Sequence, residues 1–110
     1  MATKANLVID QGATFSATIT MSDEYGNLID LSGFTGRSQM RKHYTSVSYV
    51  AFSVVLDTAE SNITLTLTDG QTANLSSGRY VYDVEILDSS SNSVSRIVEG
   101  IVTVTPNVTR

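Results

Sequence analysis

Apolar and polar residues alternate along most of this chain. In four runs, Phe15–Met21, Ile63–Leu67, Tyr80–Leu87 and Val102–Thr105, every second side chain is apolar. Because a strand turns successive side chains to opposite faces, each run predicts a strand with one face in a core. The side chains that we expect to find buried there are Phe15, Ile19, Leu65, Leu67, Tyr80, Tyr82, Val84, Val102 and Val104.

Turn-forming residues separate these runs. The segments 22–27 and 88–93 are rich in Asp, Gly, Asn and Ser. The whole pattern predicts strands near 5–9, 13–21, 28–31, 36–44, 47–57, 62–68, 79–88 and 94–105. Closely spaced turns without alternating long helices predict an all-β fold, an Ig-like antiparallel β-sandwich of seven to eight strands. A chain of 110 residues fits a single such domain, spanning 1–110.

Two segments depart from the alternation. The segment 69–75 predicts one short helical turn, with Asp69 as its N-cap, Ala73 and Leu75 facing inward and Gly78 ending it. Gly100 interrupts the last strand. A glycine inside a strand often marks a bulge or a close approach of another backbone segment. We interpret this one as a bend that carries the strand along the edge of the sandwich.

Composition and charge exclude several classes of function. The absence of cysteine excludes disulfides, thiolate metal sites and a cysteine nucleophile. The 7 basic and 11 acidic residues give a net charge of −4, which argues against a nucleic-acid partner. No apolar run approaches the roughly 20 residues of a membrane span, and the N-terminus lacks the apolar segment of a signal peptide. We therefore expect neither a nucleic acid nor a membrane as partner.

No set of residues points to catalysis or to a cofactor. His43 is the only histidine, and the chain lacks a GxSxG nucleophile elbow, so we expect His43 to have a surface or structural role. Asp23 and Glu24 share a turn that does not follow the calcium-loop pattern. Asp83 and Glu85 share a strand face, where we expect them to lie opposite Arg or Lys of a neighbouring strand. The prediction is a protein without catalytic residues, metal or cofactor.

One strand carries a basic cluster. Alternation places Arg37, Gln39 and Arg41 on the same face of the strand predicted at 36–44. One interpretation is a solvated face that guards a sheet edge against aggregation. The other is a docking patch, formed by Arg37 and Arg41, for an acidic neighbouring protein.

An ordered set of motifs extends over nearly the whole chain. They are Ile9–Phe15 (IDQGATF), Tyr25–Thr35 (YGNLIDLSGFT), Ser38–Lys42 (SQMRK), Gly78–Asp83 (GRYVYD) and Glu99–Val104 (EGIVTV). This order resembles a family of small structural proteins of tailed-phage virions. It is also similar to the N-terminal domain of phage baseplate upper proteins. The GNLIDLSGFT and GRYVYD elements are the most specific parts of the resemblance.

The resemblance implies a non-enzymatic structural and docking module of the tail, baseplate or tail-fibre adaptor. Its partners would be other virion proteins, including further copies of itself, and its location would be the virion, assembled in the host cytoplasm. A capsid decoration protein remains an alternative. A third is a carbohydrate-binding module on a phage fibre, for which Tyr25, Tyr44 and Tyr49 are the candidate exposed aromatic side chains.

Overall fold

The computed structural model describes residues 3–22, 25–28 and 30–108. Within these residues the chain forms eight strands and one short helix. In chain order they are β1 (Thr3–Lys4), β2 (Leu7–Asp10), β3 (Phe15–Thr20), β4 (Phe34–Arg41), β5 (Val50–Asp57), β6 (Asn62–Leu67), α1 (Asp69–Ala73), β7 (Gly78–Asp88) and β8 (Ser93–Thr105).

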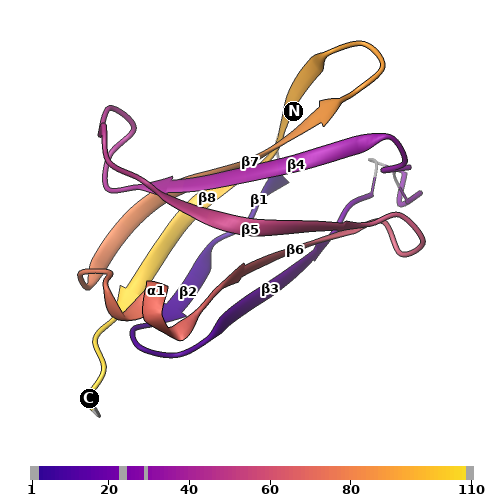
Figure 1. Ribbon diagram of the computed structural model, residues 1–110. Coiled ribbons are helices and arrows are strands. Elements are labelled where there is room, and N and C mark those ends of the chain that lie inside the picture. The colour runs from indigo at the N-terminus through magenta and orange to yellow at the C-terminus, as the bar shows by residue number, and fades with distance from the viewer. Residues whose placement is uncertain (1–2, 23–24, 29, 109–110) are drawn as a thin grey trace.

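The strands form one continuous curled sheet. Their order is β1-β8-β7-β4-β5-β6-β3, and β2 also pairs with β8, further along that strand than β1. Figure 1 shows the sheet bending at β5 and β6, so that β6 and β3 lie across from β8 and β7. The result is a half-barrel with its core on the concave side.

The prediction of an all-β fold with one short helical turn is confirmed, but the Ig-like antiparallel sandwich is not. β5 pairs with β4 through residues 50–52 and with β6 through residues 53–57, so it joins both groups of strands into one curled sheet. β1 and β2 run parallel to β8, with Leu7 opposite Val102 and Asp10 opposite Thr105. Alternation reports which face of a strand is buried but not its direction or its neighbours, so it could not reveal this arrangement.

The strand predicted at 28–31 is wrong for the described residues. Leu28 forms only an isolated bridge with Ser22, and residue 29 lies outside the described part of the chain. The Asp30 carboxylate accepts a hydrogen bond from the Ser32 N–H at 2.9 Å. Such a bond favours a turn over a strand, because the side chain replaces a ladder partner.

Most of the predicted core is buried. Ile19 and Tyr80 are the exceptions, because both are only half-buried. The confirmed members are Phe15, Leu65, Leu67, Tyr82, Val84, Val102 and Val104. Phe52, which was not predicted, lies between two of them, with its ring centroid 6.0 Å from that of Phe15 and 6.1 Å from that of Tyr82.

The helix begins one residue earlier than predicted. Thr68, not Asp69, is the N-cap: its hydroxyl accepts the Gln71 N–H at 3.2 Å. The Gln71 side chain accepts the Thr68 N–H at 2.8 Å in return, which completes a capping box. Gly78 does not end the helix but begins β7.

This shift changes which helical side chain faces inward. Ala73 is exposed, against the prediction, whereas Leu75 is buried as predicted. Thr72 is fully buried, and its hydroxyl accepts the Gly12 N–H at 3.1 Å and donates to the Ala13 carbonyl at 2.8 Å. The helix therefore fastens the β6–β7 connection to the turn between β2 and β3.

Gly100 is the site of a close backbone approach, one of the two features that a glycine inside a strand often marks. It lies opposite Tyr82 of β7, and a Cβ atom at this position would overlap the Ala5 carbonyl. The irregularity in the pairing of β7 with β8 lies elsewhere. The register shifts between Val84 and Glu85.

Candidate functional site

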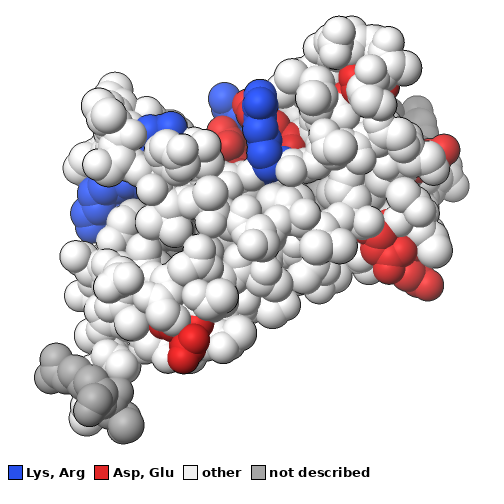
Figure 2. All heavy atoms as spheres, viewed as in Figure 1, with Lys and Arg blue, Asp and Glu red and all other residues white. Residues whose placement is uncertain are grey.

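Polar side chains from three strands meet on the convex face of the sheet. Arg37 of β4 lies opposite Glu85 of β7. Asp83 of β7 lies opposite Glu99 of β8. The side chains that gather here are Arg37, Gln39, Arg41, Asp83, Glu85, Arg96 and Glu99. Figure 2 shows basic and acidic atoms side by side in this region, while most of the visible face is uncharged.

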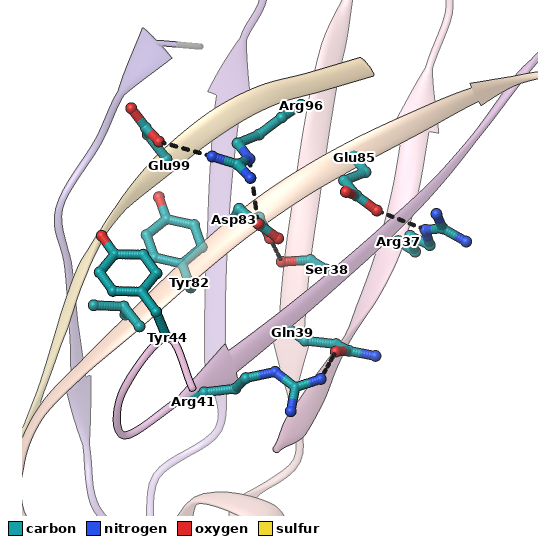
Figure 3. A pocket seen from close by; sticks show the side chains of 11 residues that line it. Arg37, Ser38, Gln39, Arg41, Tyr44, Tyr82, Asp83, Glu85, Arg96 and Glu99 are labelled. Atoms are coloured by element: carbon teal, nitrogen blue, oxygen red, sulfur yellow. Dashed lines mark hydrogen bonds and ion pairs between the residues drawn. The ribbon is translucent and has the colours of Figure 1, made fainter. Parts of the chain in front are cut away.

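These side chains surround a depression of about 410 Å³, called here the outer-face hollow. Tyr44, from the connection between β4 and β5, stands at one end of it (Figure 3). The volume lies within the roughly 300–1,000 Å³ of small-molecule sites. Most of the residues that line it are charged or polar, so the hollow suits a ligand or partner that forms many hydrogen bonds.

Ion pairs fix the charged groups of the outer-face hollow (Figure 3). Arg37 Nε lies 2.8 Å from Glu85 Oε1. Arg96 bridges two strands, with its Nε 3.4 Å from Asp83 Oδ2 and its Nη1 3.5 Å from Glu99 Oε2. Exposed pairs of this kind add little to stability. Their consequence is instead that several planar charged groups are already oriented within the hollow.

Arg41 braces the loop that carries Tyr44. Its Nη1 donates to the carbonyl oxygens of Ser46 at 2.6 Å and Val47 at 3.0 Å. Its Nη2 donates to Gln39 Oε1 at 2.9 Å, and its guanidinium carbon lies 4.8 Å from the ring centroid of Tyr49. Arg41 is therefore committed to contacts within its own chain.

The predicted docking patch lies on one face, but it is not a purely basic surface. Arg37 and Arg41 both project from the convex side of β4, as alternation predicted. Arg37 is paired with Glu85, although about 65% of its side chain is exposed. Asp83 and Glu85 do lie beside arginines of neighbouring strands, as expected from the sequence.

The pKa of the Asp83 carboxyl group is raised from its ordinary value. Burial is the largest cause, and the nearby charge of Glu85 adds to it, while Arg96 partly offsets both. A carboxyl whose pKa is higher in the folded than in the unfolded chain destabilises the fold when it is ionised. This penalty is present at neutral pH and is relieved as the pH falls through the raised pKa toward 3.8.

We therefore expect Asp83→Asn to leave the melting temperature at pH 7 unchanged or raised, although it removes the contact with Arg96. Near pH 3 the melting temperatures of Asp83→Asn and the unmodified protein should no longer differ, because the Asp83 carboxyl is then neutral in both the folded and the unfolded chain. Thermal unfolding at both pH values tests this. Glu60→Gln is the control, since it removes a charge from an exposed site away from the hollow. A lower melting temperature of Asp83→Asn at pH 7 would show that the Arg96 pair outweighs burial.

The remaining candidates are not drawn into a common site. His43 is exposed, and its backbone N–H donates to Ser46 Oγ at 3.0 Å. Asp23 and Glu24 lie outside the described residues. Across 3–22, 25–28 and 30–108, no group of three or more His, Cys, Asp or Glu side chains could hold a metal ion. In that same part of the chain no helix is long and apolar enough to cross a membrane.

The sequence did not reveal three members of the outer-face hollow. Arg96 and Glu99 come from β8. The alternation of apolar and polar residues in β8 does not predict its register against β7. Tyr44 was recognised as a candidate exposed aromatic residue, and the structure shows that 84% of it is exposed. Its position beside β7 follows from the fold of the loop 42–49 rather than from any motif.

No model of a known protein family matches the chain, and no curated protein sequence is significantly similar to it. Its architecture is that of a mostly β protein with a single curled sheet. The hollow on the convex face of that sheet brings Arg37 and Arg41 together with Asp83 and Glu85.

Proposed function

We propose that this protein is a non-enzymatic structural and docking module of a tailed-phage virion, in the tail, baseplate or tail-fibre adaptor. The order of the GNLIDLSGFT and GRYVYD elements supports the virion assignment, because it resembles small phage structural proteins. The first element leads into β4 and the second forms the start of β7. These two strands are neighbours and together form the floor of the outer-face hollow.

The observation that carries the docking role is the preorganised surface around this hollow. Its charged groups are oriented by ion pairs, and its loop is braced by Arg41 before any partner arrives. Binding to such a surface loses less conformational entropy than binding to flexible side chains. Tyr44 and Val47 of the same loop are highly exposed, at 84% and 91%. An exposed apolar contact beside fixed charges is typical of an interface.

We also infer that the half-barrel is an open form of the predicted Ig-like sandwich. β3 and β6 supply one wall, from which Leu65 and Leu67 enter the core. β7 and β8 supply the opposite wall, with Val84 and Val102. Two facing walls around one apolar layer support this interpretation, with β5 as the strand shared by both.

The partners in this proposal are other virion proteins and further copies of the chain. Repeated copies would make weak single contacts strong through multivalency. The net charge of −4 supports protein rather than nucleic acid as the partner. Mass spectrometry of purified particles tests the assignment directly. Particles that lack the protein would overturn the virion assignment, and its location in a capsid rather than a tail would favour the decoration alternative.

The docking patch itself has a sharper test. If Arg37 and Arg41 contact an acidic neighbour, Arg37→Glu with Arg41→Glu should spare folding but abolish incorporation into particles. Any residual binding should no longer respond to salt, since screening acts on the charge contribution. Incorporation is measured by immunoblot of purified particles, with circular dichroism as the check on folding.

Two further variants separate docking from loop disruption. Arg37→Glu combined with Glu85→Arg restores the ion pair in reversed order and leaves Arg41 and its loop intact. It should therefore fold normally yet lose incorporation. Arg79→Glu, on an exposed residue of β7 outside the hollow, is the control for charge reversal and should incorporate normally. Normal incorporation of the Arg37 and Arg41 double variant would eliminate the patch and leave loops or strand edges as the contact.

A further inference from the structure

Tyr44 is exposed in a way that the fold does not explain. It contributes no ring to the core, and 84% of the residue is exposed. Figure 3 shows its ring at one end of the outer-face hollow, with the charged groups of β7 and β8 beyond it. Among the described residues no hydrogen bond holds its hydroxyl group. The ring is thus an apolar surface that borders a polar depression.

Hydrogen bonds brace the loop beneath this ring. Besides the two bonds from Arg41 to its carbonyl groups, the Ser46 N–H donates to the His43 carbonyl at 3.0 Å. The His43 N–H donates to Ser46 Oγ at 3.0 Å in return. Because the loop is already braced, a ligand that binds to this exposed aromatic ring would lose little conformational entropy in ordering the loop.

The hollow keeps unused hydrogen-bonding capacity. Its ion pairs engage Glu85 Oε1, Asp83 Oδ2 and Glu99 Oε2. No donor among the described residues reaches the second oxygen of any of these carboxylates. Each arginine guanidinium carries five N–H donors, of which Arg37 uses one in its pair with Glu85. Acceptors and donors therefore stand side by side, next to the Tyr44 ring.

We propose that the outer-face hollow is a binding site for a neutral oligosaccharide. A sugar ring has an apolar C–H face that packs on an aromatic side chain, here Tyr44. Its adjacent hydroxyl groups each donate and accept, and so match neighbouring carboxylate and guanidinium groups. Three arginines and three carboxylates balance the charge of the lining, which gives a charged ligand no advantage over a neutral one.

This inference goes beyond the proposed docking function and does not depend on it, although a docked protein and a bound sugar would compete for the same hollow. The protein could be assembled into a virion without binding a sugar, and it could bind a sugar without being assembled into a virion. Saccharide binding is measured on the isolated full chain, whereas docking is measured by incorporation into particles. The two proposals can therefore fail separately.

The test is a titration of the ¹⁵N-labelled full chain with four neutral trisaccharides: maltotriose, cellotriose, mannotriose and N,N′,N″-triacetylchitotriose. We expect at least one of them to shift backbone amide signals, with a dissociation constant of about 0.1–10 mM. The shifts should be confined to residues 37–47, 81–85 and 96–99. No shift with any of the four at about 20 mM would overturn the proposal.

Variants decide whether the shifts report this site. Tyr44→Ala should weaken binding about tenfold or more, while Tyr44→Phe should retain it, because stacking needs the ring and not the hydroxyl. Tyr25→Ala is the matched control, since Tyr25 is as exposed but does not line the hollow. Equal loss in Tyr25→Ala, or undiminished binding in Tyr44→Ala, would place the sugar elsewhere and overturn the proposal. A clear preference for a polygalacturonate fragment over all four neutral sugars would also overturn it.

Discussion

Tyr82→Ala is expected to lower the free energy of unfolding by about 3–5 kcal/mol, the cost of deleting a large buried aromatic side chain. Tyr82 is 4% exposed, and its ring packs edge-on against Phe52 at 6.1 Å between centroids. Its hydroxyl donates to the Ala5 carbonyl at 2.6 Å. The substitution therefore opens a cavity and also releases the segment that joins β1 to β2. Urea unfolding, followed by circular dichroism, measures the loss.

Tyr82→Phe separates the two contributions, because it keeps the ring and removes only the hydroxyl. We expect it to cost about 1 kcal/mol, the usual value of one hydrogen bond. A loss under about 1 kcal/mol in Tyr82→Ala itself would contradict the packing described here.

The unmodified protein and Tyr82→Phe should also differ in how their stability changes at alkaline pH. Burial raises the pKa of Tyr82 to about 12, whereas a tyrosine in the unfolded chain ionises near pH 10. Between these values the unfolded chain has lost the proton that the folded chain still holds. The unmodified protein should therefore lose roughly 1–3 kcal/mol of stability as the pH rises through this window. Tyr82→Phe should lack that part of the loss.

The sequence predicted burial well where a strand is central. β7 has neighbours on both sides and packs only one face on the core, so the alternation of Tyr82 and Val84 with Asp83 and Glu85 was reliable. The buried face of β5 was harder to predict. Val55 is apolar but exposed, so both faces of this strand carry apolar residues and the pattern does not identify Phe52 as a core residue. Alternation records which face is apolar, and it fails where an outward side chain is apolar too.

Strand direction and register could not be predicted from the same pattern. Nothing in the sequence of β2 shows that it runs parallel to β8, because both orientations bury Ile9 equally. The candidate site depended on this missing information. Arg37 and Arg41 were found because they share one strand, whereas Arg96 joins them only through the pairing of β7 with β8.

Gly100→Ala is expected to be the second most damaging substitution. Its Cβ would overlap the Ala5 carbonyl group and lie 3.1 Å from the Tyr82 ring. Backbone cannot give way as a flexible side chain can, so Ala5 must move. That movement breaks both the bond from the Ala5 N–H to the Glu99 carbonyl, at 2.9 Å, and the bond from Tyr82 to Ala5. Overpacking together with two lost hydrogen bonds predicts a loss of about 2–4 kcal/mol.

The loss should begin at the N-terminal strands, since β1 and β2 are the elements that Gly100 allows to approach β8. Hydrogen exchange should accelerate at the Ala5 amide before it does at the Val84 amide in the centre of the sheet. Gly70→Ala is the control: no atom lies closer than 3.9 Å to its Cβ position, and alanine favours the helix by up to about 1 kcal/mol. If Gly100→Ala were as stable as the unmodified protein, with unchanged exchange at Ala5, the β1–β2 segment would have to shift freely. The close approach would then be incidental to the fold rather than part of what holds the edge of the sheet.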